Sequence, residues 1–232
     1  MIKDIAIAYL LLSLAYAQID FNNINERLEY NAKFRFIDAG NVSLEIRDIG
    51  ENQKHISTLF RSNKVLDMFY PIDDSVSTIF DGDFNLKRAY KRISQGSYKK
   101  IFRSVINTND NVVITNSNIE NYSFDIFDPM GLIYYIRSTD LLLLDNKFSI
   151  IDNGKIVDIQ LKISYNEKVI VNNREYSCIK VIPYGIDSSK IFKNDGLMSI
   201  WFTTDQDRIP VRIEQTTNIG PMILDIKEIK LQ

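Results

Sequence analysis

The chain has 232 residues, 45% of them apolar, and its 28 Lys and Arg nearly balance its 30 Asp and Glu to give a net charge of −2. A chain of this length can bury a substantial core in one domain. The balanced charge excludes the basic excess that a nucleic-acid-binding protein needs on one face. Composition therefore predicts one globular domain that has no nucleic-acid partner.

Residues 1–17 have the pattern of a secretory signal peptide. Lys3 supplies the positive charge, residues 5–14 the apolar core, and Ala-Tyr-Ala at 15–17 the small-x-small cleavage site. No later apolar run approaches the roughly 18 residues of a membrane-spanning helix. We therefore expect an exported protein without a transmembrane segment, whose mature chain of residues 18–232 forms a single β-barrel-like domain.

Residues 28–36 alternate between apolar and polar side chains, which is typical of a strand with one buried face. Residues 38–41 contain Asp, Gly and Asn and predict a turn, after which the alternation resumes at 42–46, as in an antiparallel hairpin. The apolar face of the first strand consists of Leu28, Tyr30, Ala32, Phe34 and Phe36.

Many further short segments have strand character and are separated by turn signals. Asn153-Gly154 is a strong hairpin turn because both residues accept positive φ. Residues 64–70 fit either a short helical turn or a bent strand. The pattern predicts a mainly β fold, a single antiparallel barrel that is either half-open or closed. The expected later strands are 56–60, 75–80, 85–92, 98–106, 112–115, 121–127, 155–165, 174–182, 196–204, 209–217 and 222–229.

One stretch, residues 128–144, has the pattern of a long helix. Asp128 suits the N-cap and Pro129 the first helical position. Every residue of 130–136 except Gly131 is large and apolar, which indicates a helix buried on all sides. We expect one buried apolar helix at about 129–144 that fills the concave side of the sheet, with its four leucines at 141–144 also covered.

Catalytic and metal-binding patterns are weak. His55 and Cys178 are the only residues of their kinds, no Gly-x-Ser-x-Gly motif occurs, and zinc needs three or four suitable ligands. Residues 81–85 copy the start of a calcium loop, but Leu86 and Arg92 stand where that loop needs Gly and Glu. The sequence predicts a protein that is not an enzyme and has neither a metal nor a cofactor.

Arg137 is the only charged residue between Asp128 and Asp140. A charge on a buried helix must be paired or reach water. One interpretation is an internal ion pair or hydrogen bonds to carbonyls at the end of the sheet. The other is that Arg137 lies at a cavity mouth and binds an anionic head group.

Several short motifs together resemble a bacterial exported family that is catalogued as domain of unknown function 3108. The most specific is Trp-x-x-x-Asp-x-x-Arg-x-Pro at 201–210. Met130-Gly131 departs from the family, which more often has Leu and Ser there. The remaining motifs are Leu28-x-Tyr30, Gly40, Gly96-Ser97-Tyr98, Asp128-Pro129 with Tyr134 and Arg137, Pro183 and Gly196-Leu197.

The resemblance implies a periplasmic protein of the cell envelope of Gram-negative-type bacteria. It also implies a fold similar to the LolA/LolB lipoprotein carriers, in which a half-open barrel holds acyl chains under a helical lid. Fold alone does not carry function. Two functions stay open: a carrier of a hydrophobic or lipid-like ligand, or a non-catalytic assembly module with a packed core and an envelope protein partner. The expected ligand-binding residues are Tyr30, Phe34, Phe36, Ile133, Ile136 and Arg137.

The export prediction has a direct test. Protein recovered from an exporting bacterium should begin at or near Gln18 because the signal peptidase cuts after the Ala-x-Ala pattern. Intact-mass spectrometry of the periplasmic fraction measures this, and a mass that includes Met1 would contradict it.

Overall fold

The computed structural model describes residues 20–35, 37–142, 144–186, 198–217 and 220–231. The expected signal peptide, residues 1–17, lies outside them. A short 3₁₀ helix, η1 (Phe21–Asn23), precedes the sheet, and α1 (Lys64–Asp67) and α2 (Pro129–Ser138) interrupt it. The strands are β1 (Glu26–Phe34), β2 (Ile37–Asp48), β3 (Gln53–Ser62), β4 (Asp73–Asp81), β5 (Leu86–Gln95), β6 (Tyr98–Asn107), β7 (Val112–Thr115), β8 (Asn118–Asn121), β9 (Ile126–Phe127), β10 (Lys147–Asp152), β11 (Lys155–Val171), β12 (Arg174–Gly185), β13 (Met198–Thr203), β14 (Pro210–Thr217) and β15 (Gly220–Leu231).

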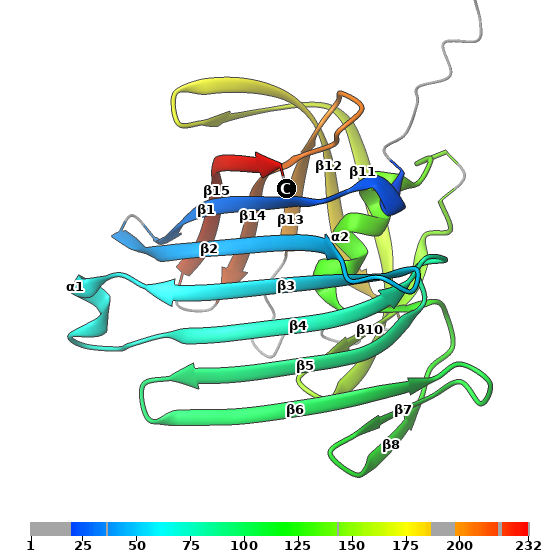
Figure 1. Cartoon of the computed structure of the whole chain (residues 1–232). Coiled ribbons are helices and arrows are strands. Elements are labelled where there is room, and N and C mark those ends of the chain that lie inside the picture. Colours follow the sequence, from blue (N-terminus) through cyan, green and yellow to red (C-terminus); the bar gives the residue numbers. More distant parts are fainter. Residues whose placement is uncertain (1–19, 36, 143, 187–197, 218–219, 232) are drawn as a thin grey trace, which may run out of the picture.

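Within the described residues all fifteen strands belong to one sheet, in the order β8-β7-β6-β5-β4-β3-β2-β1-β15-β14-β13-β12-β11-β10-β9. Neighbouring strands are antiparallel, except that β9 runs parallel to β10. Pairing of β1 with β15 joins the two halves of this meander, and the sheet curves around α2 (Figure 1). The prediction of a mainly β, antiparallel, barrel-like fold is confirmed.

The sheet is not closed, so the alternative of a closed barrel is wrong. Its two ends are the short strands β8 and β9, which do not pair with each other. β9 ends after two residues because Asp128 and Pro129 start a helix, and proline has no N–H to extend a ladder. A side-chain contact links the β8 edge to β11: Glu120 of β8 accepts a hydrogen bond from the Ile156 amide at 3.1 Å.

Helix α2 begins where the sequence predicts. The Asp128 carboxylate accepts hydrogen bonds from the amides of Met130 and Gly131, both at 3.1 Å, and Pro129 takes the first helical position. This pairing satisfies two of the four amides that a helix start leaves without partners. Gly131 is required by packing, because a Cβ there would lie 2.3 Å from the ring of Phe80.

The expected end of this helix is wrong. The helix stops at Ser138, and Thr139 is already extended with φ −112° and ψ 146°. Leu142 is 85% exposed, so the expectation that the leucine run would be covered also fails there. Arg208, which is distant in sequence, donates hydrogen bonds to the Ile136 and Thr139 carbonyls at this end, as described below.

The first hairpin forms, but its predicted turn at 38–41 is wrong. Those residues lie inside β2, and the chain turns at Arg35, which has φ 57°. Gly40 serves strand packing instead, because a Cβ there would lie 2.1 Å from the carbonyl oxygen of Arg61 on β3. The predicted Asn153-Gly154 turn is confirmed, with φ 52° and 72°. Residues 64–67 form α1, which is the helical alternative for that segment.

The concave face of the sheet has two zones. Around α2 its side chains are fully buried, as Leu28, Tyr30 and Ile200 illustrate. Farther from the helix one cross-strand row is only partly buried. Its members are neighbours in register from β13 to β1: Met198, Gln215, Met222 and Phe34.

Candidate functional site

Arg137 lies in the core, at the last turn of α2. Its side chain is 0% exposed, and both its terminal nitrogens bond to the carboxylate of Glu26 at the start of β1. Its Nε donates to the carbonyl oxygen of Asp207 at 3.0 Å, and the guanidinium lies over the ring of Tyr134 at 5.1 Å. Burial lowers the pKa of Arg137, but the bonds and charge of Glu26 outweigh that effect and the net shift is upward. Of the two interpretations of Arg137, the structure shows the internal ion pair.

The Trp-x-x-x-Asp-x-x-Arg-x-Pro segment at 201–210 holds the C-terminal end of α2. Asp205 accepts hydrogen bonds from the Thr203 hydroxyl at 2.7 Å and the Arg208 amide at 3.2 Å, which shapes the turn between β13 and β14. The Arg208 guanidinium then donates to the carbonyls of Ile136, at 3.1 Å, and Thr139. A cation that bonds to the last carbonyls of a helix also complements its dipole. The family-like motif is therefore a clamp on this helix.

The six residues expected to contact a ligand do not form one cavity. Tyr30, Ile133 and Ile136 are buried in the core with Arg137, and the Tyr30 hydroxyl donates to the Pro210 carbonyl at 2.9 Å. Burial raises the pKa of Tyr30, so its phenol stays neutral. Phe34 is only partly buried and belongs to the outer row of the concave face. Phe36 lies outside the described residues.

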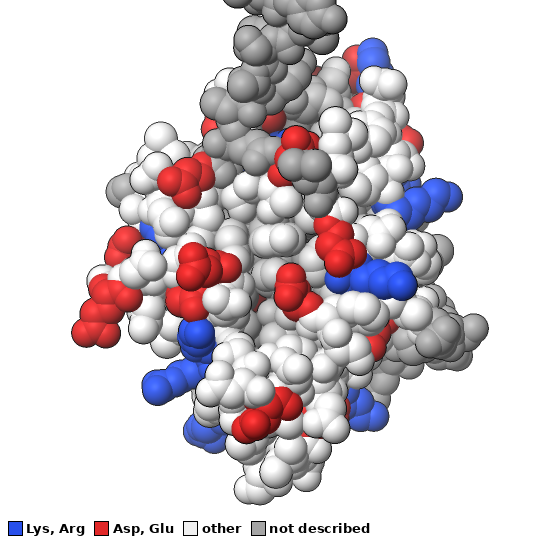
Figure 2. Space-filling view, turned by 90° about the vertical axis from the view of Figure 1, so that its right-hand side faces the viewer, with Lys and Arg blue, Asp and Glu red and all other residues white. Residues whose placement is uncertain are grey.

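An aromatic cleft of about 390 Å³ opens beside α2. Its floor includes Phe127 and Tyr135, whose ring centres are 4.8 Å apart, and Phe84, 5.3 Å from Tyr135. Asp83, Asn85, Thr108, Asn111, Ser123 and Asp125 contribute polar lining. Figure 2 shows this end of the molecule, with acidic side chains across the middle of the face and Lys and Arg toward its margins. The volume is within the range of ligand sites, but this is an open cleft with a polar rim.

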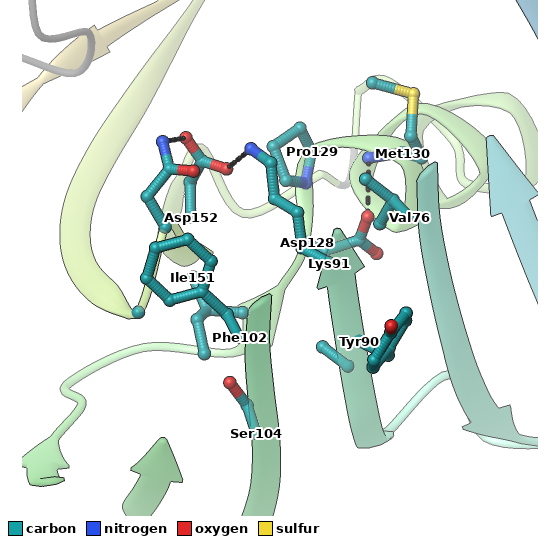
Figure 3. Close-up of a pocket in the computed structure, with 13 residues that line it drawn as sticks. Val76, Tyr90, Lys91, Phe102, Ser104, Asp128, Pro129, Met130, Ile151 and Asp152 are labelled. Carbon is teal, nitrogen blue, oxygen red and sulfur yellow. Dashed lines mark hydrogen bonds and ion pairs between the residues drawn. The ribbon is translucent and has the colours of Figure 1, made fainter. Parts of the chain in front are cut away.

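A second, smaller cavity lies beside the first turn of α2, and we call it the cap cavity. It measures about 100 Å³ and is bounded by the first turn of α2, by β4–β6 and by the turn between β10 and β11 (Figure 3). Most of its lining is apolar, and an ion pair between Lys91 and Asp152 stands at its edge. The lining residues are Val76, Ala89, Tyr90, Lys91, Phe102, Ser104, Asp128, Pro129, Met130, Ile151, Asp152, Asn153 and Gly154.

The cap cavity contains a carboxyl group with a shifted pKa. Burial raises the pKa of Asp128 from its ordinary 3.8 to about 6, against the opposing effect of the hydrogen bonds from the Met130 and Gly131 amides. Asp128 was expected as a helix cap, but its burial was not predicted. The capping carboxyl therefore takes up a proton in mildly acidic solution.

Sequence reasoning missed Lys91, Phe102 and Met130 as cavity residues. The alternation of residues 85–92 could have placed Lys91 on the concave face with Ala89. Its partner Asp152 is 61 positions away, in a turn brought there by the curvature of the whole sheet. No pattern in the sequence around either residue predicts such a contact.

The remaining residues that the sequence analysis considered as catalytic or metal-binding candidates make ordinary contacts within the fold. His55 Nε2 lies 2.7 Å from the Ser77 hydroxyl on the neighbouring strand, and burial lowers the pKa of His55. Cys178 is buried, which raises its pKa to about 11. Asp81 accepts hydrogen bonds from Asn85 within the β4–β5 turn. The described residues contain no group of three or more His, Cys, Asp or Glu that could hold a metal ion. They also contain no helix long and apolar enough to cross a membrane.

The buried ion pair predicts a large loss of stability in Arg137→Leu. That substitution leaves the Glu26 carboxylate buried without its partner, which typically costs about 3–5 kcal/mol. Urea titration should measure this loss. The double variant Arg137→Leu/Glu26→Leu should recover most of it, because no isolated charge then remains. Equal stability of the single variant and the wild type would contradict the ion pair.

Asp128 predicts a pH dependence with a definite sign. Between about pH 4 and 6 the folded carboxyl keeps a proton that the unfolded one has lost, so the free energy of unfolding falls as pH rises through this window. In Asp128→Asn the cap stays and the titration disappears. The stability of the wild type relative to Asp128→Asn should fall by about 2 kcal/mol from pH 4 to pH 7. Urea titrations at both pH values measure this difference, and a pH-independent difference would refute the prediction.

Comparison with solved structures shows a clear similarity in fold. A beta-barrel-like protein of the domain of unknown function DUF1849 from Brucella abortus superposes with a TM-score of 0.62 at 12% identity, over 90% of this chain and 98% of that one. A DUF1089 family protein from Pseudomonas aeruginosa reaches a TM-score of only 0.41 at 10% identity, over 77% of this chain and 90% of that one. The first similarity supports a shared barrel-like fold, and the second is too low to support an argument.

Sequence comparison gives the family. No curated protein matches this chain significantly. A family model described as "Protein of unknown function (DUF3108)" matches residues 29–227, which include the ion-pair arginine, the clamp motif and both cavities. The chain therefore belongs to the DUF3108 family, as its motifs predict.

Proposed function

We propose that this chain is an exported, non-catalytic, periplasmic protein of the cell envelope of a Gram-negative-type bacterium that binds a hydrophobic or lipid-like ligand. The ligand site of this proposal is the cap cavity. The observation that carries it is an apolar cavity on the concave face, beside the first turn of α2, with a single lysine at its edge. The residues at 1–17 support the export part.

The chemistry of the cavity suits an amphipathic molecule. Val76, Phe102 and Ile151 offer apolar contact, and the Lys91 side chain is 26% exposed. An anionic group on the ligand would compete with Asp152 for that ammonium through charge-assisted hydrogen bonds. Lys91 thus takes the role that the sequence suggested for Arg137, whose charge is already satisfied in the core.

The volume limits what can enter. About 100 Å³ is well below the 300–1,000 Å³ of typical ligand sites, so it admits one small apolar group such as the end of an acyl chain. Met130 lines the cavity and is partly buried. Because methionine is flexible and adapts to irregular contacts, we propose that it moves aside to admit the rest of the chain.

The alternative is a non-catalytic assembly or scaffold module that meets an envelope protein partner through its surface. The full burial of Tyr30, Ile133 and Ile136 around α2 favours this alternative, because a packed core leaves those side chains nothing to bind. The likeness to LolA/LolB carriers stays a prediction under either function. Neither function uses His55 or Cys178 as a catalytic group.

Two ten-carbon probes, one with an anionic and one with a neutral head group, test the proposal. Decanoate and decanol share a chain, and calorimetric titration measures the binding of each. Ala89→Phe fills the cavity and should abolish binding of both. Lys91→Gln should weaken decanoate about tenfold while decanol binding stays unchanged, since only decanoate uses the charge.

The matched control for the filled cavity is Arg88→Phe, which adds the same ring at an exposed position on the same strand. It should bind both probes as the wild type does. Unchanged binding in a folded Ala89→Phe would refute the cap cavity as the site. Absence of binding in the wild type, together with lipid-free extracts of the native protein, would favour the assembly module.

A further inference from the structure

The connection between β3 and β4 exposes an apolar tip. Helix α1 and the residues after it present Met68 and Phe69, each 80% exposed, together with Val65 and Tyr70. Ile37 of the neighbouring β1–β2 hairpin is also exposed. In Figure 1 this tip projects from the end of the sheet. Clustered exposed apolar residues are a common mark of an interaction site.

The tip is held in place by its own hydrogen bonds. Asn63 caps α1 by accepting from the Leu66 amide at 2.9 Å, and its own amide donates to Ala39 of β2 at 2.9 Å. The Tyr70 amide donates to the Leu66 carbonyl at 2.7 Å. The Tyr70 ring also covers Gly96, where a Cβ would lie 3.0 Å from the ring. The exposed side chains therefore sit on a structured projection.

The turns that join the first seven strands differ in charge between the two ends of those strands. The hairpin tips at the α1 end, residues 35–39, 61–74 and 92–100, contain six Lys or Arg and four Asp, a net charge of +2. The turns at the opposite end of the same strands, residues 48–54, 81–87 and 107–111, contain five Asp or Glu and two Lys, a net charge of −3. An anionic surface would attract the α1 end and repel the other.

We propose that this apolar tip docks the protein on an anionic lipid bilayer, with Met68 and Phe69 inserted among the acyl chains. Tyr70 has the amphipathic ring that favours the headgroup level, and Lys64, Lys99 and Lys100 are exposed nearby for anionic headgroups. A stable protein interface takes about 20–30 residues a side, whereas this tip exposes a handful, which suits insertion into lipid better. The docking does not depend on the cap cavity.

Flotation with vesicles tests the proposal, using protein purified from the periplasm. Wild-type protein should float with vesicles of phosphatidylethanolamine and phosphatidylglycerol, less at high salt, and poorly with phosphatidylcholine alone. Met68→Ser/Phe69→Ser should bind about tenfold more weakly or worse, because it removes the inserted side chains. The matched control Ile119→Ser/Leu142→Ser changes two other exposed apolar residues and should float as the wild type does.

Urea titration and decanol binding should be the same in the wild type and in Met68→Ser/Phe69→Ser, which separates docking from stability and from the cap cavity. A wild type that does not float, or a Met68→Ser/Phe69→Ser variant that floats equally well, would overturn the proposal. Equal flotation with vesicles of phosphatidylcholine alone would overturn the claim that the tip prefers anionic lipid. A wild-type dimer in light scattering that becomes monomeric in the variant, with no flotation of either, would assign the tip to a second copy of the chain and overturn it too.

Discussion

A guanidinium removed from water needs a compensating charge and acceptors for its fixed N–H groups, or the fold that buries it cannot persist. In this protein Arg137 obtains both, from the Glu26 carboxylate and from the Asp207 carbonyl. Glu26 opens β1, and Asp207 lies in the turn between β13 and β14. One side chain of α2 therefore ties the helix to both halves of the sheet, near the place where β1 and β15 join them.

The helix in turn explains why the sheet remains open. Asp128 and Pro129 divert the chain out of the sheet after the two residues of β9, so this edge cannot extend toward β8. At the other end of α2, the Arg208 guanidinium donates to the carbonyl of Ile136 and to that of Thr139, the residue after the helix. The cap cavity lies beside the first turn of this helix, and the aromatic cleft lies along it beside Tyr135.

These features divide the molecule into parts with separate physical properties. The middle is a packed core with a buried ion pair. One end bears acidic turns around an aromatic cleft, and the other bears an apolar tip among basic side chains. A protein that docks on a membrane by the tip would keep its acidic end away from the anionic surface. The cap cavity lies on the concave face, where α2 and the sheet meet.

The local sequence was sufficient to predict those features of the fold that depend on interactions between residues close in the chain. Period-two alternation predicted the strands of a mainly β fold, Asn153-Gly154 predicted a turn that needs two positive φ angles, and Asp128-Pro129 predicted the start of α2. The buried character of the helix also followed from its composition. Family membership was visible in the short motifs, which the match over residues 29–227 confirms.

Only the tertiary structure decided the features that depend on residues distant in sequence. At the end of α2, Arg208 bonds to the carbonyl of Thr139, 69 positions away, and the partner of Arg137 is Glu26, 111 positions away. From the sequence Gly40 looked like a turn residue. Its actual role, close packing against Arg61, follows from the pairing of β2 with β3 and is not visible locally. The cap cavity likewise joins Lys91 to Asp152 across the curved sheet. Such contacts arise from the curvature of the whole sheet. The hydrophobic periodicity or the motifs of a single segment cannot predict that curvature.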